Sequence, residues 1–261
     1  MEKFKFNTVE EAIAAIKAGK MVLVTDDEDR ENEGDLIMAA EFCTGEAINF
    51  MAKEARGLIC MPADAEIMDK LQFDAMVSHN TDNHETAFSV SIDHKDTTTG
   101  ISAFERAYTM KKVTEPGAQS MDFRRPGHVF PLRSREGGVL VRTGHTETTT
   151  DLCKLAGLKP VGICCEIMNE DGYMMRTPEL IEFALKHDLV FITVASLVAY
   201  RKRHEKMVHR VAEANLPSKY GTFKIIAYEN DLDDLCHVAL VKGEVAGQKD
   251  VLVRMHSECL T

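Results

Sequence analysis

Short apolar runs alternate with longer helix-like stretches along most of the chain. Capping signals open two of the helix-like stretches: Glu11 follows Thr8 by three residues, and Glu105 follows Ser102 by three, which is the pattern of a capping box. The apolar runs have the length of strands. Strands are predicted at 21–25, 58–61, 86–93, 138–142, 161–168 and 190–193, and helices at 8–18, 44–55, 64–71, from 102 onward, and at 146–156, 177–187 and 194–205.

The order of these elements predicts the fold class. Helices and strands alternate irregularly rather than as strict βαβ units, which favours an α+β fold: a mixed β-sheet layered with helices. A polar stretch at 202–205 predicts a boundary between a first domain, 1–205, and a second segment, 206–261. The second segment carries β-like runs at 220–228, 237–242 and 251–255 and is too short for an ordinary independent domain. We therefore expect a short β-rich appendage.

Composition narrows the class of protein. The chain has 261 residues, 44% hydrophobic and 28% charged, as in ordinary globular proteins with a real core. No window approaches ~18 consecutive apolar residues, so no membrane-spanning helix is predicted. The net charge of −11 argues against general nucleic-acid binding, which needs a basic surface. Seven cysteines without a Cys-x-x-Cys pair, and an N-terminus without an apolar signal region, favour a cytoplasmic protein.

An acidic run lies between two strand-like apolar segments near the N-terminus. Seven carboxylates fall between Asp26 and Asp35, and Arg30 is the single cation among them. A charged surface turn is the common explanation for such a cluster. A loop held between two strands needs partners for its charges, and hard divalent cations take oxygen ligands. The flanking strands and Arg30 therefore favour a metal and anion site.

A second candidate site follows the strand predicted at 138–142. Its turn runs from Arg142 to Thr146 and leads into a predicted helix. Backbone N–H groups at a helix start bind anions, an arginine adds a fixed charge, and Gly144 permits close approach. Turns of this kind also occur without any ligand, so the turn alone does not decide between the two interpretations.

Two more polar side chains stand in unusual places. Glu166 is a carboxylate in an apolar run, where burial requires a cation, a metal or a substrate beside it; at a sheet edge it would lie in water. His128 lies between Pro126 and Pro131, which excludes a regular helix and predicts a rigid turn. A lone loop histidine is commonly structural or merely exposed, so the residues alone leave its role open.

The motifs together resemble those of one enzyme family. Residues 26–36 closely resemble the acidic loop of 3,4-dihydroxy-2-butanone 4-phosphate synthase. The similarity continues in the same order along the chain and spans roughly residues 8–200. The other matching motifs are 57–60, 81–84, 97–103, 125–132 and 142–147.

The resemblance implies a reaction, cofactors and a site. The family is a lyase of riboflavin biosynthesis that converts D-ribulose 5-phosphate into 3,4-dihydroxy-2-butanone 4-phosphate and formate by enolisation, dehydration, skeletal rearrangement and C–C cleavage. It uses Mg²⁺, expected here as two ions, with Mn²⁺ able to substitute, and it is a homodimer with its active site at the subunit interface. By matching positions, the expected metal ligands are Glu31 and His145, the catalytic residues His128 and Glu166, the substrate-binding residues Arg30, Glu31, Asp35, Arg142, Thr143, Gly144, His145, Thr146 and Glu166, and the accessory residues Glu33, Cys60 and Thr99.

The C-terminal segment resembles a different family. Residues 216–221 and 251–261 are similar to the opening of GTP cyclohydrolase II, which often follows the synthase in bifunctional riboflavin enzymes. In that family the cysteine matching Cys259 is a zinc ligand, with two further cysteines shortly downstream. A catalytic zinc takes about three protein ligands, and the sequence ends at Thr261, before those two further cysteines. We therefore expect a truncated bifunctional protein without GTP cyclohydrolase II activity.

Two rival functions remain open on the residues. One is another metal-dependent sugar-phosphate enzyme, an aldolase or an isomerase. The other is a non-catalytic module that binds a metal or a nucleotide, which would leave the turn at 142–146 and Glu166 without a chemical role. Formate release from ribulose 5-phosphate separates both rivals from the synthase.

Overall fold

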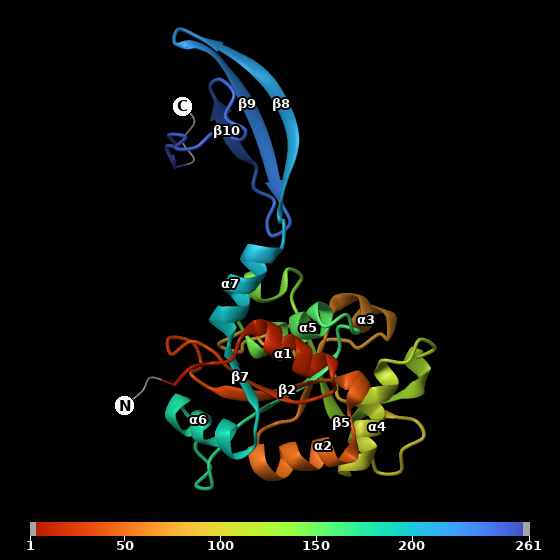
Figure 1. Cartoon of the computed structure of the whole chain (residues 1–261). Coiled ribbons are helices and arrows are strands. Elements are labelled where there is room, and N and C mark those ends of the chain that lie inside the picture. Colours follow the sequence, from red (N-terminus) through yellow and green to blue (C-terminus); the bar gives the residue numbers. More distant parts are fainter. Residues whose placement is uncertain (1–3, 258–261) are drawn as a thin grey trace. The chain divides into compact units, whose positions relative to one another are not determined.

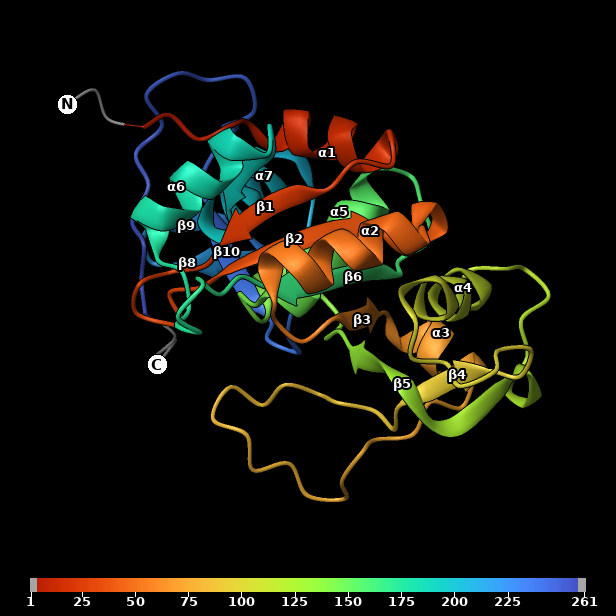
Figure 2. The same ribbon diagram turned by 90° about the horizontal axis from the view of Figure 1, so that it is seen from below.

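The computed structural model describes residues 4–257, so Cys259 lies outside the described residues. The chain divides into two units, Met1–His204 and Glu205–Thr261. The first unit is built on one seven-stranded mixed sheet with the strand order β4-β5-β3-β6-β2-β1-β7, most of which can be followed in Figure 2. Its strands are β1 (Val22–Thr25), β2 (Gly34–Ala39), β3 (Cys60–Ala63), β4 (Ile92–His94), β5 (Phe123–Arg133), β6 (Gly162–Glu166) and β7 (Val190–Thr193).

Helices cover both faces of this sheet (Figure 1). α1, α5 and α7 pack into one hydrophobic cluster, and α2, α4 and α6 pack into the other. This arrangement confirms the prediction of a mixed sheet layered with helices. The helices are α1 (Val9–Lys17), α2 (Gly45–Phe50), α3 (Ala65–Lys70), α4 (Ala103–Val113), α5 (His145–Leu155), α6 (Thr177–Lys186) and α7 (Val194–His204), with a π-helical turn at Met51–Ala55 that extends α2.

The two central strands β1 and β2 are buried along their whole length. Successive side chains of a strand point to opposite faces, so Leu23 and Leu36 join the cluster under α2, α4 and α6, while Val24 and Ile37 join the other. β2 pairs antiparallel with both β1 and β6. It is therefore held on both sides, and the acidic loop between β1 and β2 begins and ends on fixed backbone.

The capping signals located the helices well. Thr8 and Glu11 form the reciprocal capping box at the start of α1, and the side chain of Ser102 accepts a hydrogen bond from the backbone of Glu105 at the start of α4. The predicted helices at 64–71, 146–156, 177–187 and 194–205 are confirmed within two residues at each end. These signals act within a few residues, which is why they can be read from the sequence.

Three strand predictions for the first unit were wrong in whole or in part. Residues 138–142 form a 3₁₀ turn, Gly138–Leu140, rather than a strand. Of the strand predicted at 86–93 only β4 exists, because residues 74–91 form a long loop, gold in Figure 2, with isolated bridges at Phe88 and Ser89. The strand predicted at 58–61 is β3, Cys60–Ala63, which contains Pro62. β3 pairs with β6 only at Cys60 and through a bridge at Ala63, so no N–H group is needed from Pro62 on that side.

A further error concerns the backbone around His128. The two prolines predicted a rigid turn, whereas β5 runs through the whole segment from Phe123 to Arg133. β5 pairs antiparallel with β4 at Phe123, Arg124 and Val129, and parallel with β3 along Phe130–Arg133, so the segment 125–128 is held extended by the pairing before and after it. A proline lacks only its own N–H, so a strand can contain it at an irregular position.

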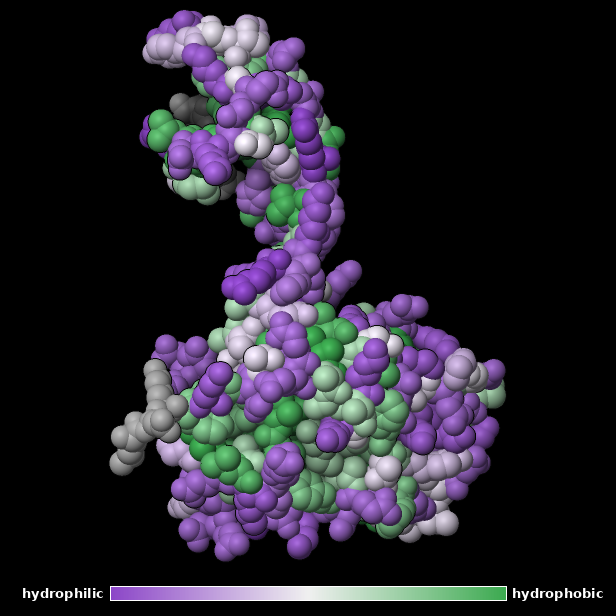
Figure 3. All heavy atoms as spheres, viewed as in Figure 1, coloured by the Kyte–Doolittle hydropathy of each residue, from purple (hydrophilic) through white to green (hydrophobic). Residues whose placement is uncertain are grey.

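The second unit is a three-stranded antiparallel sheet in the order β10-β9-β8. β9 (Gly221–Asn230) and β10 (His237–Val241) confirm two predicted strands, whereas residues 251–257, the last that the structure describes, form no strand. The sequence missed β8 (Val208–Ser218), which is exposed throughout and so lacks an apolar alternation. Figure 3 accordingly shows hydrophilic side chains over most of this unit, with hydrophobic ones scattered among them. In the described part of the chain, no helix is long and apolar enough to cross a membrane.

A core substitution tests the central position of β2. Leu36 is fully buried, and replacing a buried leucine with alanine leaves a cavity that costs about 2–5 kcal/mol. We expect Leu36→Ala to lower the free energy of unfolding by that amount in urea titrations. The matched control is Leu185→Ala on α6, where the side chain is 70% exposed and the change is expected to stay within about 0.5 kcal/mol. Equal effects of the two substitutions would contradict the buried position of Leu36.

Candidate active site

Asp26 folds the acidic loop. Its buried carboxylate accepts hydrogen bonds from Arg30 Nη1 at 2.7 Å and from the backbone N–H groups of Glu31 at 3.3 Å and Glu33 at 2.9 Å. The chain therefore closes around Asp26, and Arg30 and Glu31 become partly buried, whereas residues 27–29 stay exposed. The description as a charged surface turn is right for residues 27–29 only.

Glu31 lies between two cations. Arg30 Nη1 is 2.7 Å from Glu31 Oε2, and His145 Nδ1 is 3.8 Å from the same oxygen. Burial by itself would raise the pKa of Glu31, but the hydrogen bonds and charges of His145 and Arg30 outweigh it and lower the pKa to about 2. Glu31 is therefore ionised at neutral pH.

His145 begins α5 and points into the same cluster. Its Nε2 lies 3.2 Å from the carbonyl oxygen of Val24, an acceptor that requires a proton on Nε2. In the neutral ring Nδ1 then carries the lone pair, and it faces Asp35 Oδ1 at 3.4 Å and Glu31 Oε2 at 3.8 Å. Burial lowers the pKa of His145, but the surrounding carboxylates, Asp35 foremost, outweigh burial and raise it to about 9.

Two carboxylates lie next to each other on neighbouring strands. Asp35 on β2 and Glu166 on β6 are direct register partners. Burial raises the pKa of Asp35 to about 6 against the opposing pull of His145, and burial together with the charge of Asp35 raises the pKa of Glu166 to about 7. Glu166 Oε2 also accepts a hydrogen bond from the backbone N–H of Leu58 at 2.8 Å. Glu166 thus lies on a central strand and not at the exposed sheet edge.

A cavity of about 130 Å³ joins these groups. Nine of the residues expected from the sequence line it, drawn from the acidic loop, β2, β3, β6 and the start of α5. Cys60 is among them, and burial raises the pKa of its thiol, which keeps it protonated. The nine are Arg30, Glu31, Glu33, Asp35, Cys60, Arg142, His145, Thr146 and Glu166; the sequence missed Thr86, Phe88, Leu132 and Cys164, which complete the wall.

Asp26, Glu31 and His145 could hold a metal ion. Each offers one ligand atom, and these atoms lie within 4.8 Å of one another. Beside them Asp35 Oδ1 is buried and accepts no hydrogen bond from any described residue, and its charged neighbour is His145 Nδ1 at 3.4 Å. Carboxylate oxygens suit a hard divalent cation. The hydrogen bond from His145 Nε2 to the carbonyl oxygen of Val24 holds the ring so that Nδ1 points at the carboxylates. The sequence had no signal that separated Asp26 from its acidic neighbours.

The start of α5 brings two arginines together. Gly144 is its N-cap residue and has no side chain, so the first N–H groups of the helix stay open to a ligand. A Cβ atom at Gly144 would lie 2.4 Å from Arg142 Nη1 and 3.0 Å from Arg30 Nη2. Arg142 Nη1 is also 2.6 Å from Glu147 Oε2. The absence of a side chain at this position is what lets both guanidinium groups approach the helix start.

Four expected residues are not among those that line the cavity: Gly144, described above, and Thr143, Thr99 and His128. Thr143 is exposed beside the cavity. Thr99 is exposed and its hydroxyl is 3.4 Å from Glu105 Oε2, which places it in the cap of α4. His128 lies on β5, and its ring Nδ1 is 2.8 Å from Asp93 Oδ2. Within one chain, therefore, the structure does not bring His128 to Glu31, His145 and Glu166.

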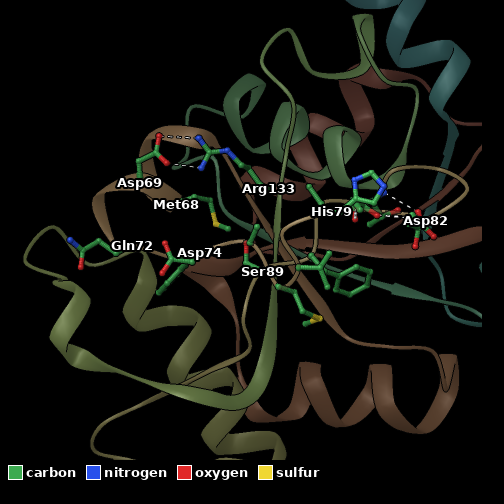
Figure 4. Close-up of a pocket in the computed structure, with 17 residues that line it drawn as sticks. Met68, Asp69, Gln72, Asp74, His79, Asp82, Ser89 and Arg133 are labelled. Atoms are coloured by element: carbon green, nitrogen blue, oxygen red, sulfur yellow. Dashed lines mark hydrogen bonds and ion pairs between the residues drawn. The ribbon is translucent and has the colours of Figure 1, made fainter.

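A second and larger cavity, of about 890 Å³, lies between α3 and the loop that precedes β4 (Figure 4). Thr86 and Phe88 line both cavities. In the larger one the guanidinium of Arg133 is engaged by Asp69, at 2.6 and 2.9 Å. Figure 4 shows this pair at one end of the cavity and the side chains of His79 and Asp82 at the other. The cluster of opposed charges and the candidate metal ligands belong to the smaller cavity.

Comparison with known proteins shows the family of the chain and agrees with its fold. The family model of 3,4-dihydroxy-2-butanone 4-phosphate synthase matches residues 10–200, and that of GTP cyclohydrolase II matches residues 209–261. The chain belongs to the 3,4-dihydroxy-2-butanone 4-phosphate synthase family, which confirms the resemblance seen in its motifs. Its second segment matches a short part of the GTP cyclohydrolase II family.

Individual relatives span both segments. The riboflavin biosynthesis proteins RibBA of Bacillus cereus and Bacillus mycoides are each 55% identical over 256 residues, which is 98% of this chain and 64% of theirs. The chain thus spans about 64% of the length of these curated relatives. A two-domain 3,4-dihydroxy-2-butanone 4-phosphate synthase from A. baumannii is 44% identical with a TM-score of 0.84, covering 91% of this chain and 70% of that one.

A second solved structure bears on the metal. It is a 3,4-dihydroxy-2-butanone 4-phosphate synthase in complex with two magnesium ions, 42% identical with a TM-score of 0.74. The match covers 76% of this chain and 98% of that protein.

Metal binding should release a proton from His145. In the metal-free chain the pKa of about 9 keeps His145 protonated at neutral pH, whereas a metal requires the unprotonated nitrogen. We expect Mg²⁺ binding at pH 7.5 to release about one proton, and the apparent affinity to rise with pH until the pH reaches the pKa of His145. Calorimetry in two buffers of different ionisation enthalpy measures the release. His145→Gln should abolish it and the exposed-site control His209→Gln should not; binding without proton release would contradict the ligand role.

Proposed function

We propose that this chain converts D-ribulose 5-phosphate into 3,4-dihydroxy-2-butanone 4-phosphate and formate, with Mg²⁺ as cofactor. The observation that carries the proposal is one cavity in which a possible metal cluster, two carboxylates of raised pKa and two arginines at a helix start meet. Each has a use in this reaction, because the substrate is a phosphorylated sugar whose carbonyl chemistry moves protons. Family membership over residues 10–200 supports the same assignment.

The phosphate is assigned to the start of α5. Arg30 and Arg142 both approach Gly144 there, and the helix start adds N–H donors from His145 and Thr146. Glu147 pairs with Arg142 and fixes its orientation, while Arg30 is fixed by Asp26 and Glu31. A phosphate would thus meet two pre-oriented guanidinium groups at little entropic cost.

Glu31 and His145 would hold the metal, with Asp26 and Asp35 beside them. A divalent ion supplies Lewis-acid stabilisation of negative charge on the substrate oxygens. We assign two Mg²⁺ ions to the working site and expect Mn²⁺ to substitute, because Mn²⁺ accepts the same carboxylate and imidazole ligands.

Proton transfer is assigned to Glu166 and Asp35. A general acid–base group works best when its pKa lies near the working pH, and burial raises the pKa of Glu166 to about 7. Glu166 can therefore take a proton in one step and return it in another without a large free-energy cost. Glu33 and Cys60 line the same wall and are accessory groups. Thr99 lies in the cap of α4, and its assignment as an accessory group rests on the family resemblance.

His128 is assigned to the site of a second copy of the chain. It lies outside the cavity of its own chain, and its side chain is 41% exposed. The loop that packs against its partner Asp93 continues into Ile101 and Phe104, apolar residues that are 52% and 64% exposed. A homodimer with shared active sites would account for an exposed histidine outside its own cavity and would cover exposed apolar side chains of this kind.

We propose the same division as from the sequence: a synthase domain, 1–205, and a GTP cyclohydrolase II-like segment, 206–261. The matched ranges of 10–200 and 209–261 support this division. The expected lack of GTP cyclohydrolase II activity in this chain stays a prediction. Cys259, on which that expectation rests, lies outside the described residues.

Formate release tests the function against its rivals. We expect the chain to release formate from D-ribulose 5-phosphate, EDTA to abolish the release and added Mg²⁺ to restore it, because the carboxylate cluster needs a cation. An aldolase, an isomerase or a binding module would release none. Glu166→Gln should lower turnover by about 10²-fold or more. The control Glu170→Gln, whose side chain is 93% exposed, should keep it. Formate released at full rate in EDTA would rule out the metal role.

Complementation tests the shared site. His128→Ala and Glu166→Gln should each be inactive alone, since each removes one part of every site. In mixed dimers one of the two sites regains both residues, so random exchange should restore about a quarter of wild-type turnover in a two-fold symmetric dimer. The control is the His128→Ala variant alone, taken through the same subunit exchange. Activity that stays at the level of the single variants would show that His128 does not act across an interface.

A further inference from the structure

β5 carries an irregularity next to β4. Ile92 of β4 lies opposite Val129, but Asp93, the next residue, lies opposite Arg124. Residues 125–128 of β5 therefore have no partner on β4 and form a bulge. A bulge bends a strand and re-aims the side chains it contains, and here the re-aimed residue is His128.

Side chains of the neighbouring strand segment hold the bulge in place. The hydroxyl of Ser91 accepts a hydrogen bond from the backbone N–H of Gly127 at 3.1 Å. Asp93 Oδ1 accepts one from the backbone N–H of His128 at 3.0 Å, and Asp93 Oδ2 lies 2.8 Å from the ring Nδ1 of the same residue. The two oxygens of one carboxylate thus fix both the backbone and the ring of His128.

The carboxylate of Asp93 is buried and confined by the residues around it. The residue is 5% exposed, and a Cβ atom at Gly100 would lie 2.1 Å from its Oδ2. Gly100 has a positive φ of 86°, so the loop before α4 closes directly over the carboxylate. A buried carboxylate without partners is costly, and the N–H groups of His128 are the partners it has. The ring Nδ1 must therefore carry a proton, which leaves Nε2 on the exposed side of the ring.

We propose that Asp93 is the positioning residue for His128: it holds the ring as the Nδ1–H tautomer and presents Nε2 as the atom that exchanges protons with the substrate. The inference rests on the proposed function, because His128 has a substrate to act on only if the chain is the synthase. An acidic side chain plays this part for a histidine in many enzymes, by fixing tautomer and orientation and stabilising the protonated ring.

A purely structural clamp between β4 and β5 is the competing explanation. It predicts that loss of the carboxylate lowers stability and leaves the histidine chemistry unchanged. The positioning role predicts a change of tautomer and a loss of kcat at constant KM. Asp93→Asn separates the two, because the amide keeps the shape but can offer an N–H to the ring where the carboxylate offered an acceptor.

The experiment measures the tautomer first. In the ¹⁵N-histidine-labelled full chain, with His128 assigned by comparison with His128→Ala, long-range ¹H–¹⁵N spectra at alkaline pH should show the Nδ1–H form in wild type and the Nε2–H form in Asp93→Asn. Turnover of ribulose 5-phosphate should fall by about 10²–10⁴-fold with KM within about twofold, the scale for loss of such a carboxylate. The matched control is Asp96→Asn. Its carboxylate is 60% exposed and lies 3.6 Å from the ring of His94, and it should change neither the tautomer of His128 nor kcat.

Several outcomes would overturn the proposal. A wild-type His128 in the Nε2–H form would do so even if Asp93→Asn failed to fold. So would a switched tautomer with wild-type turnover, or lost turnover with an unswitched tautomer, which marks the structural clamp. The tautomer is measured without substrate, so it does not depend on the proposed function. A wild-type chain that releases no formate would contradict the proposed function, while the spectra would still report the tautomer of His128.

Discussion

The crowding of carboxylates around one small cavity is the constraint on which the rest of the site depends. Asp26, Glu31, Glu33, Asp35 and Glu166 converge there, and the cations facing them are few. Buried like charges repel and lose their hydration, so every element around the cavity either neutralises a carboxylate or keeps it protonated. Arg30 and His145 are the cations that pair with these carboxylates.

The carboxylates are divided into two groups by their surroundings. Glu31, next to Arg30 and His145, has its pKa lowered to about 2, whereas Asp35 and Glu166, opposite each other on β2 and β6, have theirs raised to about 6 and 7. A single cavity thus holds both a permanently ionised carboxylate suited to a cation and carboxyl groups able to exchange protons near neutral pH. Asp35 Oδ1 accepts no hydrogen bond from the described residues and has the imidazole of His145 at 3.4 Å as its charged neighbour.

The two histidines are oriented by opposite devices. His145 donates from Nε2 to the carbonyl of Val24 and presents Nδ1 inward to the carboxylates. His128 is bound at Nδ1 by Asp93 and presents Nε2 outward. In each case a neighbouring acceptor selects the nitrogen that is left for function. The same side chain can therefore serve as a metal ligand inside one cavity and as a proton carrier at an exposed face.

Local chemistry is what the sequence by itself determined. Capping boxes, apolar runs and the acidic run act within about four residues of each other, so the helices and most central strands could be predicted from them. The nine residues of the cavity wall were predicted as a set only through the family resemblance of their motifs. The tertiary structure alone decided how distant residues meet. Register placed Asp35 opposite Glu166, 131 positions away along the chain, and a shift of one residue would have turned one of them to the other face. The tertiary structure also buried Asp26, which closes the acidic loop, and left Asp27 exposed. It placed the prolines around His128 in a strand and kept His128 apart from the cavity. No local pattern predicts these outcomes, because the free energy of strand pairing depends on partners that are distant in the sequence.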